Sequence, residues 1–421
     1  MLKLFLLWIS LLANSAFAAN TSSNPDSLAT ASSLMMPKGI YSVGVKQYNI
    51  INTSLCPDPL FSIDSAWAFS NQNRCHQMRT IIYYPIAKNT TRSPYNTFVI
   101  NAWQDDIKYK VGPTVQKDQL SSILASLNSI KSYTQNGGDI VSGNFPVIIF
   151  QPGFTYSSSD YENYITNLVS NGYIVVGIDA YHNTNMIIGS RELKAHEPSQ
   201  PNNLFITGSN ATLAQSDLKF MIDALKKMKA QAVDPVFQHM NLDKIGGLGH
   251  SLGAYSVYKN SLESGLLSAG VALDIVGGRD FSDYQPTANP FLFLRSSFGS
   301  QGELKIFNKK SQFNLGKNEY LVFMSPMLQT DNYSMHNSFQ DLVTLQYNKA
   351  VLFDFELNKT KPHQVLGQVN GYTFTADVNQ YLLVFFDNFL KNQQSIVFMN
   401  CKSPNKNSIL FCNNSVMSLQ F

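Results

Sequence analysis

Six short apolar segments in the middle of the chain limit its fold more than any other feature of the sequence. Their hydrophobic residues follow one another without the alternation of a strand that has one face in water. Such uninterrupted runs are typical of parallel strands covered on both faces. The segments are FPVIIF at 145–150, YIVVGID at 173–179, KIGGLGH at 244–250, GVALDI at 270–275, FLFLRS at 291–296 and YLVFMS at 320–325.

Helical patterns lie between several of these segments. In SDLKFMIDALKKM, residues 216–228, apolar residues recur at the spacing of one helix face. The segment YLLVFFDNFL, residues 381–390, has the same character, and we expect it to cover the sheet rather than to bind lipid. Alternating strands and helices predict an α/β fold, with a mostly parallel central sheet covered by helices on both faces.

The size and composition of the chain fit one large domain. The chain has 421 residues, of which 44% are hydrophobic and 14% charged, enough for a large core. We expect a single domain over 39–421, preceded by a flexible leader at 19–38 that is rich in Ser, Ala and Thr. Two stretches, near 88–144 and 183–212, interrupt the alternation and are either lid-like insertions or surface decoration.

The N-terminal residues resemble an export signal. Lys3 precedes an apolar run at 4–12, and Ala16 and Ala18 follow at the small-x-small spacing of a signal-peptidase site. The run is shorter than the roughly 20 residues that span a bilayer, which argues against a membrane anchor. We expect residues 1–18 to be a cleaved signal peptide, and the protein to be periplasmic or secreted.

Four cysteines would remain after cleavage, an even number in a chain expected in an oxidising compartment. Closeness in sequence favours disulfides between Cys56 and Cys75 and between Cys401 and Cys412, although four cysteines permit three pairings. The absence of a C-x-x-C pair makes zinc binding the weaker interpretation. Two β-rich stretches, 39–50 and 78–87, flank the first cysteine pair and are expected to be the first strands of the sheet.

The stretch KIGGLGHSLGAYSVY places Ser251 in a G-x-S-x-G pattern. The pattern alone can mark an ordinary turn, but here it follows an apolar strand and precedes a helix. A strand, a sharp turn and a helix are the arrangement that exposes a nucleophilic serine, and glycines keep side chains out of the crowded turn. The sequence therefore predicts that Ser251 is a nucleophile.

A nucleophilic serine needs a base, usually a histidine, oriented by a carboxylate. Of the seven histidines, only His336 and His363 lie far enough beyond Ser251 to fit the chain order serine, acid, histidine. His336 is favoured because it follows the last strong strand. His250, next to the serine, is expected to point elsewhere and to be structural.

Asp274, at the end of a predicted strand, is the favoured acid, since strand ends carry catalytic residues in such sheets. Asp280 and Asp283 are rivals in the same connection. The oxyanion formed in acyl transfer needs two donors. We expect the backbone N–H groups of Leu252 and Phe154 to supply them.

Several stretches resemble the secreted platelet-activating factor acetylhydrolases, also called lipoprotein-associated phospholipase A2, and their bacterial relatives among the α/β-hydrolases. The acid block is the discriminating one, because in this family the carboxylate follows the sixth strand rather than the seventh. The similar stretches are YSVGV at 41–45, IIYYP at 81–85, the block 145–179 from FPVIIF to VVGID, IGGLGHSLGAYS at 245–256, AGVALDIVG at 269–277 and MHNSFQDL at 335–342.

The resemblance implies an α/β-hydrolase fold and a phospholipase A2-like or acetylhydrolase activity on phospholipids with short or oxidised acyl chains. It also implies Ser251, Asp274 and His336 as a triad that requires no metal or organic cofactor. One departure affects the loop that would carry the Phe154 donor of the oxyanion. Relatives usually carry His-Gly where this chain has Pro152-Gly153.

These observations lead to the hypothesis of an exported serine hydrolase that cleaves carboxylic esters through an acyl-enzyme. A general carboxylesterase, lipase or polyester hydrolase is the alternative, followed by an acyltransferase and by a non-catalytic binding protein on the same scaffold. Trp103, Tyr109 and Phe154 are aromatic residues that would support peripheral contact with a membrane or lipid surface. The formal net charge is only +3 and there is no run of like charges, so the composition gives no support for nucleic-acid binding.

Overall fold

The fold is known from a computed structural model, which describes the greater part of the chain. The expected signal peptide, Trp103, Tyr109, Asp280, Asp283 and Cys401 lie outside the described residues. The described residues are 33–56, 75–89, 117–180, 183, 186–188, 191–193, 208–275, 285–296, 315–324, 333–348, 351–352, 355, 359–395, 397–398 and 408–412.

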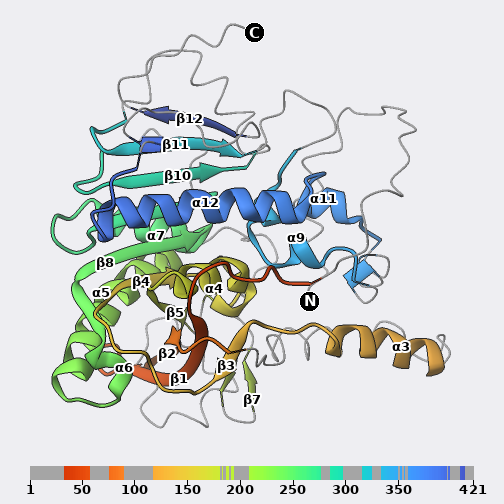
Figure 1. Cartoon of the computed structure of the whole chain (residues 1–421), viewed down its shortest axis with the longest axis horizontal. Helices are drawn as coiled ribbons and strands as arrows, with labels where there is room; N and C mark the ends of the chain where they lie inside the picture. The colour runs from red at the N-terminus through yellow and green to blue at the C-terminus, as the bar shows by residue number, and fades with distance from the viewer. Residues whose placement is uncertain are drawn as a thin grey trace, which may run out of the picture.

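A twisted sheet of ten strands forms the centre of the described structure, in the order β12-β11-β10-β9-β8-β4-β5-β2-β1-β3 (Figure 1). Neighbouring strands are parallel from β5 through β4, β8, β9 and β10 to β11. Antiparallel pairings join β2 to β5 and β12 to β11. The strands are β1 Ser42–Asn52, β2 His76–Ile86, β3 Thr134–Asn136, β4 Phe145–Gln151, β5 Ile174–Ala180, β8 Met240–His250, β9 Ala269–Leu273, β10 Phe291–Arg295, β11 Glu319–Met324 and β12 Ser408–Cys412.

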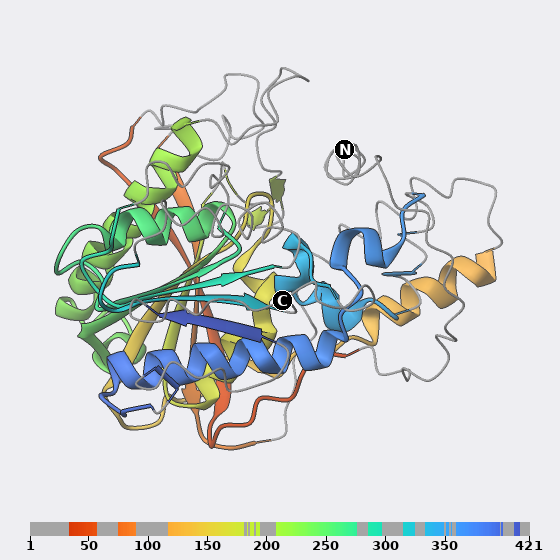
Figure 2. The ribbon, with the colours of Figure 1, turned by 90° about the horizontal axis from the view of Figure 1, so that it is seen from above.

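Helices cover both faces of this sheet, as Figure 2 shows from above. On one face lie α4 and α12; on the other lie α5, α6 and α7. Each of the six predicted apolar runs contains a largely buried strand. The helices are α3 Lys117–Asn128, η4 Ser158–Tyr161, α4 Glu162–Ser170, α5 Gly208–Ala230, α6 Pro235–Gln238, α7 Leu252–Ser261, η6 His336–Phe339, α9 Leu342–Leu345, α11 Pro362–Leu366 and α12 Gly371–Leu390.

Alternate residues of one strand supply the two halves of the core, which is why the runs are continuous. In β4, Ile148 and Phe150 pack with α4 and α12, whereas Val147 and Ile149 pack toward α5 and α7. Segment 381–390 forms the second half of α12 and packs on the sheet, as predicted. Among the described helices, none has the length and apolar character needed to cross a bilayer.

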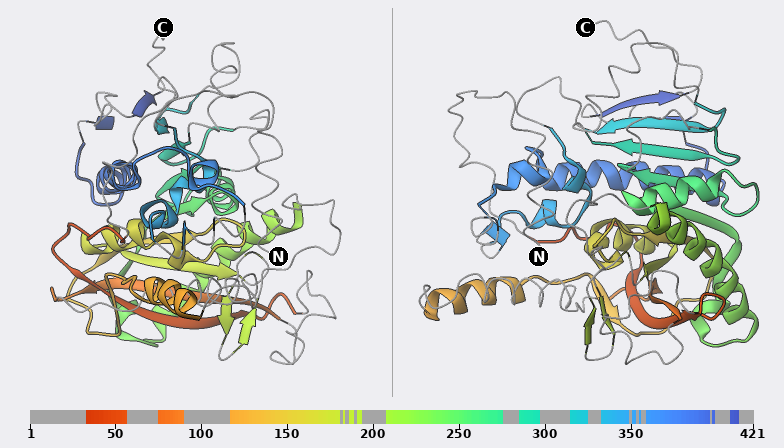
Figure 3. Two further views of the ribbon diagram at one scale, coloured as in Figure 1. Left: turned by 90° about the vertical axis from the view of Figure 1, so that its right-hand side faces the viewer. Right: turned by 180° about the vertical axis from the view of Figure 1, so that it is seen from behind.

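The two interrupting segments contain regular structure where they are described. In 88–144, β3 adds a strand to the sheet edge, and α3 extends away from the sheet in the views of Figure 3. In 183–212, β6 Met186–Ile188 and β7 Arg191–Leu193 form a two-stranded sheet, and α5 begins at Gly208. Whether either segment acts as a lid stays a prediction.

The N-terminal part of the described chain is fastened to the domain. Cys56 and Cys75 form a disulfide between the end of β1 and the start of β2, as predicted. Leu34, inside the expected leader 19–38, is buried with 2% exposure. The backbone N–H of Met35 donates to Asn163 at 2.7 Å. Contacts with the domain therefore begin before residue 39.

Candidate active site

Ser251 occupies the sharp turn between β8 and α7. Its backbone has φ 56° and ψ −114°, a conformation that L-residues rarely adopt and that costs roughly 1–3 kcal/mol. Both flanking glycines are required by close approach. A Cβ on Gly249 would lie 2.3 Å from the backbone of Gly253, and one on Gly253 would lie 2.0 Å from the carbonyl oxygen of Gln151. The turn therefore has the geometry predicted for a serine nucleophile.

Two backbone N–H groups flank this serine. Leu252 is the first residue of α7, so its N–H has no acceptor within the helix. Residues 153–156, here called the oxyanion loop, form a turn closed by the bond from Tyr156 N–H to Gly153 O at 3.1 Å. Phe154 lies at its second position, where the N–H is not needed to close the turn. A Cβ on Gly153 would lie 3.3 Å from Ser251 Cβ, so the loop adjoins the serine.

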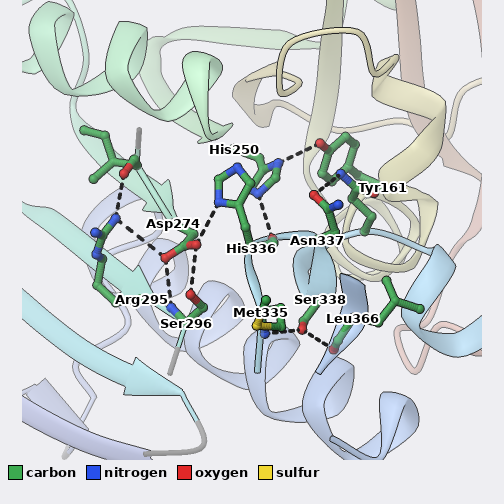
Figure 4. A network of polar contacts seen from close by, with 12 residues as sticks. Tyr161, His250, Asp274, Arg295, Ser296, Met335, His336, Asn337, Ser338 and Leu366 are labelled. Carbon is green, nitrogen blue, oxygen red and sulfur yellow. Dashed lines mark hydrogen bonds and ion pairs between the residues drawn. The ribbon is translucent and has the colours of Figure 1, made fainter. Parts of the chain in front are cut away.

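Asp274 follows β9 directly and is fixed beside the serine by the backbone. Ser251 N–H donates to Leu273 O at 3.0 Å, and Asp274 N–H donates to Leu294 O at 2.7 Å. The Asp274 side chain is buried and lies among donors (Figure 4). Ser296 N–H and Ser296 Oγ each donate to its carboxylate at 2.9 Å. The strand end after β10, a common place for the acid in such sheets, here carries a serine that holds the acid of β9.

The surroundings of Asp274 stabilise its negative charge. Burial by itself would raise the pKa of this carboxyl group, but the positive charge of Arg295 and the hydrogen bonds from His336 and Ser296 outweigh it. Together they hold the pKa of Asp274 well below its ordinary value of 3.8. Arg295 Nη1 lies 3.6 Å from Asp274 Oδ1 and also donates to Ile275 O at 2.7 Å. Asp274 is therefore a carboxylate at neutral pH.

His336 begins η6, in the segment 333–341 that we call the histidine segment. Its Nδ1 lies 2.8 Å from Asp274 Oδ2 (Figure 4). Because a carboxylate can only accept, Nδ1 carries a proton, and in the neutral imidazole Nε2 is then bare and able to accept a proton. The imidazole is 27% exposed, so a substrate can reach it. The structure thus joins the predicted Asp274 and His336 across 62 residues of sequence.

The other predicted candidates lie elsewhere or are not described. His363 is in α11, and its carbonyl accepts from Tyr333 Oη at 3.4 Å. His76, which precedes Ser251 in the chain and was not a candidate base, pairs with Asp217 at 2.8 Å, and both side chains are fully buried. In the described part of the chain, no group of three or more His, Cys, Asp and Glu side chains is arranged to hold a metal ion.

Sequence reasoning missed three residues of this site: Arg295, Ser296 and Tyr161. His250 was expected to point away and to be structural, yet its ring lies against that of His336, with centroids 4.5 Å apart. Tyr161 Oη lies 2.8 Å from His250 Nδ1. No local pattern identifies these partners, because each contacts a residue that belongs to another strand or helix. The nearest signal was the pair Arg295 and Ser296 at the end of the apolar run that forms β10.

Comparison with known proteins identifies the fold. No protein-family model matches the chain. A ferulic acid esterase from Streptomyces cinnamoneus has a similar structure, with a TM-score of 0.61 and 19% sequence identity over 91% of this chain and 100% of that one. The chain has the α/β-hydrolase fold. This confirms the predicted fold class.

The sequence of this chain also has a distant relative. It is 26% identical over 142 residues to a probable 1-alkyl-2-acetylglycerophosphocholine esterase of Arthroderma benhamiae. The match covers 34% of this chain and 33% of the relative, so the chain matches about a third of the relative's length. The expected resemblance to platelet-activating factor acetylhydrolases is thus confirmed as a distant one.

Proposed function

We propose that this α/β-hydrolase cleaves carboxylic esters, with Ser251 as nucleophile, His336 as base and Asp274 as the acid that orients His336. The hydrogen-bonded Asp274–His336 pair beside the strained serine turn carries the proposal. The bare Nε2 of His336 takes the proton of Ser251 as Oγ attacks the ester carbonyl carbon. The negative carboxylate of Asp274 stabilises the imidazolium that forms.

The rest of the reaction uses the same groups. The N–H groups of Leu252 and Phe154 would hold the oxyanion of the tetrahedral intermediate. As the intermediate collapses, His336 returns its proton to the leaving alcohol, and an acyl-enzyme remains on Ser251. Water, activated by His336, then attacks the acyl carbon and releases the carboxylic acid. An alcohol in place of water would make the protein an acyltransferase.

The proposed substrate is a phospholipid with a short or oxidised acyl chain at its second position. Similarity to the probable 1-alkyl-2-acetylglycerophosphocholine esterase supports this choice. A general carboxylesterase, lipase or polyester hydrolase is the second candidate, favoured by Pro152, which stands where acetylhydrolases usually carry histidine. Both candidates use the same triad and differ in the groups that surround it.

The site of action is proposed to lie outside the cytoplasm. The N-terminal residues 1–18 support export, and the disulfide between Cys56 and Cys75 suits an oxidising compartment. Intact-mass analysis of the protein recovered from the periplasm and the medium tests this, since cleavage after Ala18 predicts a defined mass. Contact with lipid surfaces is a further proposal from the substrate class, and co-sedimentation with phosphatidylcholine liposomes tests it.

Activity assays on the mature protein test the proposed function. The substrates are p-nitrophenyl acetate and an alkyl-acetyl-glycerophosphocholine, assayed with the wild type, Ser251→Ala and the control Ser261→Ala. Ser261 lies in the same helix, and its Oγ donates to Val257 O at 2.9 Å, away from the turn. We expect both activities in the wild type and the control and neither in Ser251→Ala. Turnover of the simple ester alone would favour the second candidate, and no turnover of either would contradict an ester hydrolase with these substrates.

A further inference from the structure

A chain of hydrogen bonds passes behind Ser251, from the oxyanion loop to the histidine segment. Gly153 N–H donates to Tyr161 Oη at 3.2 Å. Tyr161 Oη lies 2.8 Å from His250 Nδ1, and His250 Nε2 lies 3.1 Å from the backbone oxygen of His336 (Figure 4). Three hydrogen bonds therefore connect the loop expected to hold the oxyanion with the backbone of the expected base.

The ends of this chain and the charge state of His250 together determine where its protons lie. Gly153 N–H can only donate, and the His336 carbonyl can only accept, so His250 carries a proton on Nε2. Burial, followed by the nearby charge of His336, lowers the pKa of His250 well below its ordinary value and favours the neutral ring. In the neutral ring Nδ1 is bare, and the Tyr161 hydroxyl donates to it.

Packing leaves little freedom for these groups to move. Tyr161 and His250 both have 0% exposure. The Tyr161 ring packs on Phe150, with centroids 4.9 Å apart. A Cβ on Gly153 would lie only 2.9 Å from His250 Nδ1, closer than real Cβ atoms come, so the oxyanion loop rests directly on the pair. A displacement of either side chain would therefore shift both the loop and the histidine segment.

Both ring nitrogens of His250 are engaged, so it has no free nitrogen to act as a base for Ser251. Its influence passes through His336, which is held at its ring by Asp274 and at its carbonyl by His250. We propose that Tyr161 and His250 are positioning residues that fix the distance between the oxyanion donors and the His336 base across Ser251. The inference rests on the proposed function, because it assumes that Ser251 and His336 react.

The pair should affect the rate of reaction at Ser251 more than the binding of substrate. A displacement of about 1 Å at a reacting group can cost roughly 100-fold in rate. We expect His250→Leu, which removes both bonds of the ring, to lower kcat roughly 100-fold. Tyr161→Phe, which leaves the His250–His336 bond in place, should lower kcat roughly 10-fold with KM nearly unchanged.

A matched control and a conservative variant separate positioning from packing. Tyr164 is also fully buried, in α4, and its hydroxyl makes no hydrogen bond to Tyr161, His250 or Gly153. Tyr164→Phe therefore removes a buried hydroxyl outside the network and should leave kcat unchanged. His250→Gln keeps an N–H that can donate to the His336 carbonyl, and it should recover part of the rate lost in His250→Leu.

The experiment measures the rate of Ser251 phosphonylation by a fluorophosphonate probe, together with kcat and KM for p-nitrophenyl acetate. In phosphonylation, Ser251 Oγ forms a bond to phosphorus, fluoride leaves, and His336 takes the serine proton. The rate therefore depends on the base and on the oxyanion donors, whatever the natural substrate is. Thermal midpoints of all variants show whether each is folded.

We expect phosphonylation rates in the order wild type and Tyr164→Phe, Tyr161→Phe, His250→Leu, with His250→Gln above His250→Leu. Equal rates in Tyr161→Phe and Tyr164→Phe would overturn the positioning role and leave the proposed function intact. Losses that follow the thermal midpoints, or that appear only in KM, would also overturn it. A wild-type protein in which the probe does not label Ser251 would instead contradict the proposed nucleophile, and the positioning role with it.

Discussion

Two buried carboxyl groups of this molecule differ in charge at neutral pH: one is ionised and the other is protonated. Asp274, at the end of β9, is 4% exposed, and Glu162, at the start of α4, is 5% exposed. The pKa of Asp274 lies below its ordinary value, whereas burial, with a contribution from nearby carboxyl groups, raises the pKa of Glu162 to about 8. Equal burial therefore does not decide whether a carboxyl group in this core is charged.

The neighbours of the two groups explain the difference. Each accepts a hydrogen bond from a serine hydroxyl, Ser296 in one case and Ser132 in the other. Asp274 also has Arg295, a buried positive charge. Glu162 instead has Asp341, whose carboxylate accepts from the N–H groups of Glu162 and Asn163 at 2.7 and 2.9 Å. A buried cation keeps Asp274 ionised, whereas burial, with a smaller contribution from neighbouring carboxyl groups, favours the protonated form of Glu162.

The largest expected effect comes from removing the charge of Asp274. Asp274→Asn keeps the size of the side chain but offers an amide to His336 Nδ1, which favours the wrong tautomer of the imidazole. We expect kcat for p-nitrophenyl acetate to fall about 10⁴-fold. Asp234→Asn is the control, because Asp234 pairs with Lys46 at the surface end of α6 and should leave kcat unchanged. Equal activity of both variants would show that the charge of Asp274 is not needed.

The second-largest effect tests whether Arg295 causes the difference in charge between Asp274 and Glu162. Arg295→Leu leaves Asp274 buried without its cation, so we expect the free energy of unfolding at pH 7 to fall by about 3–5 kcal/mol. Arg295→Lys keeps the charge and should lose less. In the wild type, the lowered pKa of Asp274 contributes stability above pH 3.8 that disappears as the pH falls below that value.

Without Arg295, the carboxyl group takes up its proton at higher pH. The gap in unfolding free energy between wild type and Arg295→Leu should therefore narrow as the pH falls from 7 toward 4. Urea unfolding across this range measures the gap. A gap that does not depend on pH would mean that Arg295 stabilises the fold by packing alone.

The third effect concerns Glu162. A folded-state pKa raised to about 8 favours the protonated side chain, so wild-type stability falls as the pH rises from its ordinary pKa of 4.5 toward 8. Glu162→Gln cannot ionise and should lack this loss. We expect equal thermal midpoints near pH 5 and a higher midpoint for the variant near pH 8, where its free energy of unfolding should exceed that of the wild type by a few kcal/mol, at about 1.4 kcal/mol per pKa unit. Parallel curves would contradict a raised pKa.

The sequence predicted the elements of this comparison unevenly. The strands, the serine turn and the candidates Asp274 and His336 come from local patterns: apolar runs, a motif, and positions after strands. The fold class is confirmed, and Asp274 and His336 are hydrogen-bonded, while their catalytic roles stay predictions. These features are local because a strand or a turn is specified by neighbouring residues.

The partners that set charge and position were not predictable in this way. Arg295 and Ser296 meet Asp274 only because β9 and β10 are neighbours in the sheet. Asp341 meets the start of α4 across 179 residues of sequence. His250 was expected to point away from the site, because its contact with His336 depends on where the histidine segment packs. Such contacts follow from the three-dimensional arrangement and have no sequence period.

The smallest expected effect concerns the hydroxyl group of Ser296, which is compared with that of Ser261. Ser296→Ala removes one hydrogen bond to a charged acceptor, while the bond from Ser296 N–H to Asp274 remains. We expect a loss of about 1.5–3 kcal/mol in unfolding free energy at pH 7. Ser261→Ala, which removes a bond to the neutral carbonyl of Val257, should lose only about 0.5–1.5 kcal/mol. Urea unfolding at pH 7, where Asp274 is ionised, measures both losses. Equal losses at pH 7 would mean that the hydroxyl of Ser296 does not help to keep Asp274 charged, and would leave Arg295 as the main cause.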